Sequence, residues 1–238
     1  MELSRKKELA RFLSTALLAA FALQGAEIPA EHEHWRKGCP GVVQIDERGI
    51  RFVPKVSGPK AHDWSWAWPD VQRLELSADR IVVVTYEDVR WRLGADRAVR
   101  FRALPGQSFL DAYDLLRDRE EVRLVARVAD KAEQTLWEVP VKRLGRIQGS
   151  HGILKAGPAR LIYESISQNY SMTWKYKQIK YITLLAEDRL ALATAAGQYV
   201  FQLKAPIGEA RYDELWRRVQ AAQGLSLGPE GAGQQGVW

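Results

Sequence analysis

The chain has 238 residues, of which 46% are hydrophobic, and a formal net charge of +6. This composition is typical of a globular protein and excludes a disordered or collagen-like chain, and the mild charge indicates no nucleic-acid partner. One cysteine and four histidines exclude an intramolecular disulfide and any zinc or iron–sulfur site built from several cysteines.

Residues 1–26 are typical of a secretory signal peptide. A basic segment at residues 1–11 precedes an apolar run at residues 12–23, and Ala26 precedes the acidic Glu27. The apolar run is shorter than the roughly 20 residues of a membrane-spanning helix. We therefore expect cleavage and export to the periplasm or the cell envelope. The alternative is an uncleaved segment that anchors the protein at the inner membrane.

A histidine pair and the single cysteine follow this segment. His32 and His34 are two residues apart, so on a strand they would share one face. The thiolate of Cys39 is close enough in sequence to complete a zinc or copper site, and His62 or Glu31 are further donors. The alternative is a polar lead-in in which Cys39 is buried as a small apolar residue. We expect no cofactor, and the metal site is an alternative interpretation only.

Alternating apolar residues then predict a series of short strands. Residues 42–45 and 50–53 flank a polar turn with a glycine, which is typical of a hairpin. Trp64, Trp66 and Trp68 alternate with smaller residues, as in a half-buried strand. Further apolar runs occupy residues 71–76, 81–86, 89–93 and 99–102.

The apolar period changes from two to that of a helix after residue 108. Phe109, Ala112, Tyr113 and Leu116 recur at the spacing of one helix face, and Ser108 is a suitable N-cap. The strands and this helix together make a unit of about seven short strands and a closing helix in roughly 80 residues, enough for a small domain.

The same order of elements occurs twice. The alignment pairs residues 38–43 with 149–154, residues 66–71 with 174–179, and residues 113–114 with 212–213. Length changes fall between the apolar runs, as expected of loops. Residues 86–93 lack a counterpart and predict an extra or longer hairpin. The predicted organisation is a signal peptide at 1–26, domains at 38–119 and 143–224, an ordered connection at 120–142 and a disordered tail at 225–238.

This pattern resembles the pleckstrin-homology (PH) superfold, including bacterial PH-like and GRAM-like domains. The resemblance rests on the strand order, the closing helix, the Gly41–Phe52 opening and the Trp-x-[Trp/Tyr] corners at Trp66 and Trp174. It implies a mainly β (α+β) fold of two antiparallel β-barrels or sandwiches, each closed by a C-terminal amphipathic helix. It also implies binding rather than catalysis. Neither first hairpin carries the basic cradle of a phosphoinositide-binding domain, so membrane contact is not indicated.

Aromatic and basic residues of the first copy form the predicted binding surface. Trp66 and Trp174 occur in both copies, which indicates core positions. The remaining tryptophans and a set of alternating arginines predict a basic face for an acidic partner. These residues are Trp64, Trp68, Trp91, Arg90, Arg92, Arg100 and Arg102.

No enzymatic motif accompanies these residues. The sequence contains no Gly-x-Ser-x-Gly elbow, phosphate loop or dinucleotide fingerprint, and nothing in it places an orienting residue for a Cys39–histidine pair. We therefore expect a non-catalytic exported protein of two PH-like domains that binds a protein or ligand at the cell envelope. The alternatives are a metal-binding module that uses His32, His34 and Cys39, and a membrane-associated protein with an uncleaved anchor.

Overall fold

The computed structural model describes residues 25–34, 38–56, 62–89, 92–145, 149–167 and 170–224, with only the backbone at residues 92 and 93. Most of the expected signal peptide, the expected tail at 225–238, Arg90 and Trp91 lie outside the described residues. The described chain is mainly β and holds two α-helices. Neither is long and apolar enough to cross a membrane.

The chain divides into two compact units, a first unit at Met1–Leu124 and a second unit at Val125–Trp238. The short strand β8 (Leu124–Ala126) lies at this boundary. Each unit is described by itself below.

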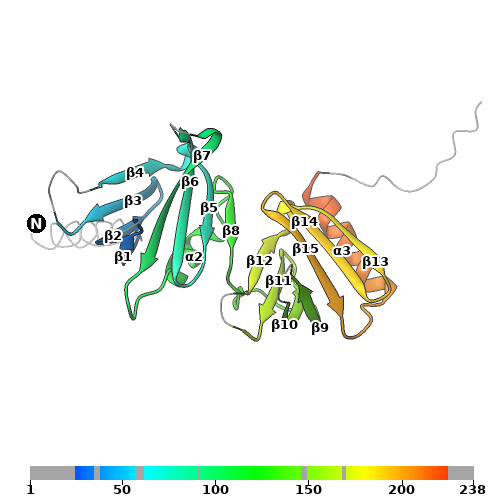
Figure 1. Ribbon diagram of the computed structural model, residues 1–238. Coiled ribbons are helices and arrows are strands. Elements are labelled where there is room, and N and C mark those ends of the chain that lie inside the picture. The colour runs from blue at the N-terminus through cyan, green and yellow to red at the C-terminus, as the bar shows by residue number, and fades with distance from the viewer. Residues whose placement is uncertain are drawn as a thin grey trace, which may run out of the picture. The chain divides into compact units, whose positions relative to one another are not determined.

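The first unit is an antiparallel ladder in the order β5-β6-β7-β1-β2-β3-β4 (Figure 1). A 3-10 turn, η1 (Trp68–Asp70), separates β4 from β5, and a helix follows β7. Its elements are β1 (Ala26–His32), β2 (Cys39–Ile45), β3 (Gly49–Pro54), β4 (Trp64–Ala67), β5 (Val71–Leu76), β6 (Arg80–Val89), β7 (Arg92–Ala103) and α2 (Leu110–Leu116).

The second unit repeats this order as β13-β14-β15-β9-β10-β11-β12. The 3-10 turn η2 (Tyr176–Gln178) separates β12 from β13, and the longer helix α3 follows β15 (Figure 1). Its elements are β9 (Trp137–Leu144), β10 (Ser150–Ala156), β11 (Arg160–Ser165), β12 (Met172–Lys175), β13 (Ile179–Ala186), β14 (Arg189–Thr194), β15 (Gly197–Leu203) and α3 (Glu209–Ala222).

The two units also share their strand register. His32 on β1 lies opposite Cys39 on β2, and Arg143 on β9 lies opposite Ser150 on β10. These are the pairs that the sequence alignment makes equivalent. In each unit the strand before the helix then pairs with the first strand, β7 with β1 and β15 with β9.

Equivalent aromatic rings fill both cores. In each unit the last strand contributes a phenylalanine that contacts one ring from the third strand and the tryptophan of the fourth. The centroid distances are 4.9 Å for Phe52–Phe101 and 6.4 Å for Trp66–Phe101 in the first unit, and 5.3 Å for Tyr163–Phe201 and 6.3 Å for Trp174–Phe201 in the second. Trp66 and Trp174 are thus core residues in both copies, as the duplication predicts.

Neither ladder is closed, in contrast to the barrels that the sequence analysis expected. Among the described residues, no strand pairing joins β4 to β5 or β12 to β13. The chain passes from β4 to β5 through η1 and from β12 to β13 through η2. In η1 the corner contains Pro69, which has no N–H to donate to a neighbouring strand. The second corner contains no proline.

One strand lies outside the range expected for the first domain. β1 lies before residue 38, where the first domain was expected to begin, and it pairs with both β2 and β7. Residues 86–89 extend β6 along β7, with Val89 opposite Arg92, which matches the longer hairpin of the two expected alternatives.

Candidate functional site

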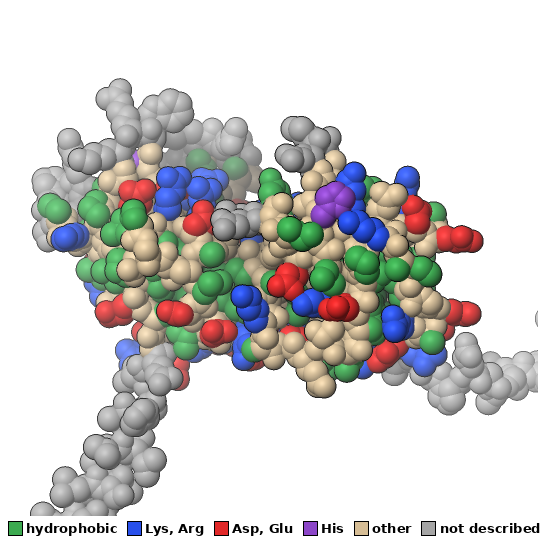
Figure 2. Space-filling model, turned by 90° about the horizontal axis from the view of Figure 1, so that it is seen from below, with side chains coloured by type: hydrophobic (Ala, Val, Ile, Leu, Met, Phe, Trp, Pro, Cys, Tyr) green, Lys and Arg blue, Asp and Glu red, His purple; other side chains and the backbone are tan. Residues whose placement is uncertain are grey.

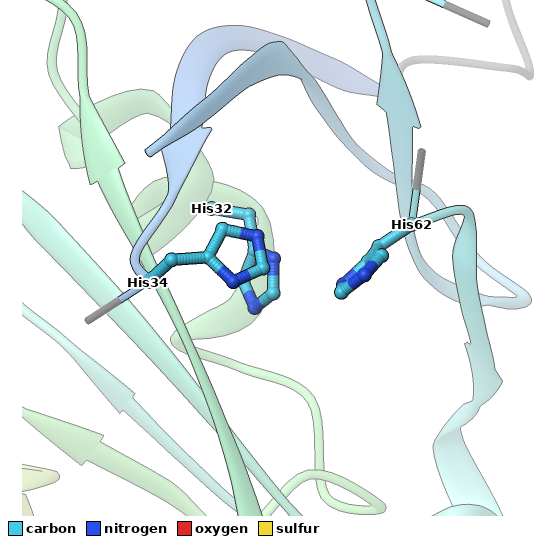
Figure 3. Close-up of side chains that lie close together, drawn as sticks. All are labelled: His32, His34 and His62. Carbon is cyan, nitrogen blue, oxygen red and sulfur yellow. The ribbon is translucent and has the colours of Figure 1, made fainter. Parts of the chain in front are cut away.

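Three of the four histidines of the chain converge in the first unit (Figure 3). His32 is the last residue of β1, His34 follows it by two residues, and His62 lies two residues before β4. The ring centroids are 4.3 Å apart for His32–His34, 4.8 Å for His34–His62 and 5.4 Å for His32–His62. We call these three residues the histidine cluster.

The nitrogen atoms of the histidine cluster face one another. One ring nitrogen from each residue lies within 4.8 Å of the other two. His32 is 7% exposed, His62 is half-buried and His34 is exposed. Among the described residues, Nδ1 of His32 and Nδ1 of His62 are buried without a hydrogen-bond partner. Buried polar atoms normally have a partner, so these two nitrogens are exceptions that call for an explanation.

Burial keeps His32 uncharged. Desolvation, and then the positive charge on His34, His62 and Arg97, lowers the pKa of His32 to about 4. The imidazole is therefore neutral at physiological pH, and a neutral imidazole is the form that can coordinate a metal ion.

Aromatic rings line one side of the histidine cluster. Trp64 lies 5.9 Å from both His32 and His62, and it stacks on Trp66 at 5.4 Å. The guanidinium of Arg97 lies 4.5 Å from the centre of the Trp64 ring. Trp64 is therefore part of the surroundings of the histidines rather than an isolated surface tryptophan.

Cys39 adjoins the histidine cluster at one residue. Its Sγ lies 3.2 Å from Nε2 of His34. The metal ligands of the alternative interpretation, His32, His34 and Cys39, are thus close together, and His62, one of its two further donors, lies beside them. The i, i+2 spacing was a usable sequence signal for His32 and His34. His62 was named only as a further donor, because no local spacing indicates a proximity that depends on the pairing of β3 with β4.

Trp68, which was expected at a binding surface, is buried. It is 4% exposed, and its indole nitrogen donates to the carbonyl oxygen of Asp46 at 3.2 Å. Tyr176 takes the equivalent place in the second unit, where its hydroxyl donates to the carbonyl oxygen of Gly157 at 2.7 Å. Trp68 is therefore a structural residue and presents no face to a partner.

The expected arginine face is only partly assembled. Arg100 and Arg102 lie two residues apart on β7 and are exposed, but Arg102 forms an ion pair with Glu33 at 2.6 Å. Arg80, opposite Arg102 on β6, lies 3.3 Å from the same carboxylate oxygen. On the face drawn in Figure 2, basic and acidic side chains lie interspersed. The side chains of Arg90, Trp91 and Arg92 are outside the described part of the chain.

The second unit exposes a hydrophobic strand that the sequence analysis did not single out. β13 is the terminal strand of its ladder, and α3 packs beside it (Figure 1). Tyr181, Leu184 and Leu185 on β13 are 45%, 37% and 61% exposed. Large apolar side chains grouped on a sheet edge mark a site where another chain can add.

No protein-family model matches the chain, and no curated protein matches it. Solved structures that are similar to parts of it include the N-terminal PH domain of the human ARAP2 protein. That likeness has 12% identity and a TM-score of 0.33, and it covers 42% of this chain and 92% of that one.

Two further solved structures are similar to parts of the chain. The C-terminal domain of an unknown protein from Leishmania infantum is 17% identical with a TM-score of 0.32, covering 37% of this chain and 84% of that one. A chain of the Spt16D Pob3N heterodimer is 11% identical with a TM-score of 0.30, covering 73% of this chain and 84% of that one.

Proposed function

We propose that the protein is a non-catalytic exported binding protein of two PH-like units, and that its second unit binds an extended segment of a partner protein along β13. The PH-like assignment is supported by seven antiparallel strands followed by a helix in each unit. The binding assignment rests on one observation, the exposed hydrophobic edge of β13.

The equivalent strand of the first unit shows how unusual this edge is. β5 buries its apolar residues and carries an ion pair at 3.2 Å between Arg73 and Glu75 on its more polar side. The alignment places Tyr181 and Thr183 of β13 where β5 has this pair. Leu76 of β5 is fully buried, whereas its counterpart Leu184 is 37% exposed. The two copies therefore differ in apolar surface at this edge.

The first unit also indicates what kind of chain such an edge accepts. The backbone N–H of Leu74 on β5 donates to the carbonyl oxygen of Arg123 at 3.1 Å, so an extended segment lies along β5. A partner segment that added to β13 in the same way would gain main-chain hydrogen bonds and cover the exposed leucines. The partner is thus an extended peptide with apolar side chains.

Charge substitutions on β13 test this proposal. In affinity capture from the envelope fraction, Tyr181→Glu and Leu185→Glu should each lower the captured amount at least about tenfold, because a carboxylate would be desolvated in the contact. Both side chains are exposed, so the fold should tolerate the change. The matched control is Tyr86→Glu, which alters a tyrosine that is 56% exposed on β6.

Two results would contradict the proposal. One is capture by both β13 variants at the level of the unchanged protein. The other is self-association of the purified protein that Leu185→Glu abolishes, since β13 would then bind a second copy of the chain rather than a partner.

Export has a separate test. Cleavage after Ala26 would leave residues 27–32 of β1 in place, including Glu27, whose carboxylate accepts from Gln44 at 2.9 Å. Mass spectrometry of the protein from its native cell should therefore find a chain that begins at Glu27. An intact Met1 would contradict export with cleavage and favour the anchored alternative.

A further inference from the structure

We infer that the histidine cluster is a binding site for a divalent transition-metal ion of the zinc type, with His32, His34 and His62 as its three protein ligands. This site lies in the first unit and goes beyond the partner binding proposed for β13. Three imidazoles are a donor set that suits zinc, cobalt and copper ions, and they leave a further coordination position for water or a ligand.

The donor atoms are nearly close enough to share one ion. Zinc–nitrogen bonds of about 2.0–2.1 Å place the nitrogens of a tetrahedral site roughly 3.3 Å apart. In the structure the three nitrogens lie within 4.8 Å of one another. Two of the three side chains, His34 and His62, are not fully buried and sit at or next to strand ends. Small rotations of these rings therefore suffice to complete the site.

A metal ion also accounts for the unpartnered nitrogens. The side chain of His32 is buried, with an exposed fraction of 7%, and its Nδ1 has no hydrogen-bond partner among the described residues. The Nδ1 atom of His62 is also buried and has no hydrogen-bond partner among the described residues. A purely structural aromatic cluster would leave these two nitrogen atoms without a hydrogen-bond partner, which is unfavourable for buried polar atoms. At His32 and His62, coordination would use lone pairs that no protein donor occupies.

In the second unit, the positively charged side chain of Arg143 lies at the position equivalent to the histidine cluster. Arg143 takes the position of His32, and Tyr170 takes that of His62. The guanidinium of Arg143 lies 5.8 Å from the centres of the Tyr170 and Tyr199 rings, and it donates to the Tyr170 carbonyl oxygen at 3.4 Å. The first unit has three imidazoles where the second has this guanidinium. A bound metal ion would put positive charge at the same point of the fold.

Zinc titration of the full chain, purified without a histidine tag and stripped by a chelator, tests the inference. We expect one zinc ion per chain by elemental analysis, with a rise in the melting temperature as zinc is added. His34→Ala and His62→Ala should each weaken zinc binding at least about tenfold, because each removes a ligand. The control is His151→Ala, which removes the fourth histidine, exposed on β10, and should bind as tightly as the unchanged chain.

Folding of the variants is checked in metal-free buffer. His34→Ala and His62→Ala should there melt within a few degrees of the unchanged protein, because neither side chain is fully buried. His32→Ala is left out, since it would open a cavity in the core. The inference is overturned if the stripped chain takes up no stoichiometric zinc. It is equally overturned if both variants bind zinc like the unchanged chain, or if His151→Ala weakens binding as much as they do.

Discussion

Trp68 and Tyr176 perform the same structural task with different side chains. Each begins a 3-10 turn, is 4% exposed, and donates one hydrogen bond to the backbone of the turn between the second and third strands of its unit. Burial raises the pKa of the Tyr176 phenol well above its usual range, so it stays a donor. The sequence predicts Trp68 at a surface because its counterpart, Tyr176, is not a tryptophan. Residue identity was the wrong criterion, since indole and phenol are interchangeable as donors here.

Tyr176→Phe should destabilise the second unit by about 1 kcal/mol, because it removes one buried hydrogen bond and leaves the Gly157 carbonyl unpaired. For a unit of this size the melting temperature should fall by roughly 4–8 °C. Thermal unfolding followed by circular dichroism measures the change. Tyr181→Phe, which alters an exposed tyrosine of the same unit, should leave the melting temperature unchanged. Equal melting temperatures for all three proteins would refute a structural role for the phenol.

The histidine cluster was partly predictable at this scale. The spacing of His32 and His34 predicted that they share a face, and the nearby Cys39 does contact His34. The third imidazole belongs to His62, which is 28 positions after His34 in the sequence. Only the pairing of β3 with β4 brings it near the other two. Contacts of this kind depend on tertiary structure, which a local pattern does not contain.

At the scale of elements, a buried ion pair holds the β10–β11 turn of the second unit. One carboxylate oxygen of Glu133 lies 2.7 Å from Nη1 of Arg160, and the other accepts from the backbone N–H of Ala159 at 2.7 Å. The side chains of Arg160 and Glu133 are 9% and 6% exposed. The carboxylate therefore neutralises a buried guanidinium and fixes the turn backbone at the same time.

Glu133→Ala should cost about 3 kcal/mol of unfolding free energy, because it leaves the buried Arg160 without this counter-charge. The value is at the low end for a broken buried pair, since Asp130 lies 3.6 Å from the same guanidinium. Glu138→Ala is the control, because its contact with Lys155 at 4.0 Å is at the surface and worth little. Chemical denaturation measures the unfolding free energy of both variants. A loss below 1 kcal/mol for Glu133→Ala would contradict the account of this turn.

The elements themselves were predicted unevenly. Strong alternation identified β3 and β4, and the change of period identified α2. β1 was missed because its buried positions are Ile28, Ala30 and His32, of which only one is a strong strand former, and because Pro29 weakens the pattern. What stabilises β1 is pairing on both sides, with β2 and β7, and the sequence of the strand alone does not reveal it.

At the scale of the whole molecule, two units with the same strand order carry different surfaces. The shared register and core rings explain why the order of motifs in the sequence was a sufficient signal for the duplication. The diverged positions were less predictable, because an exposed leucine and a buried one look alike in sequence. The histidine cluster and the β13 edge are both positions where one copy departs from the other.

The most direct test of the proposed function is amide hydrogen exchange with the captured partner bound. Addition of a partner segment to β13 should slow exchange at residues 180–186, because their outward N–H groups would join new main-chain hydrogen bonds. The equivalent residues of β5 should exchange as they do in the free protein. Protection that appears on the first unit, with residues 180–186 unchanged, would contradict the account.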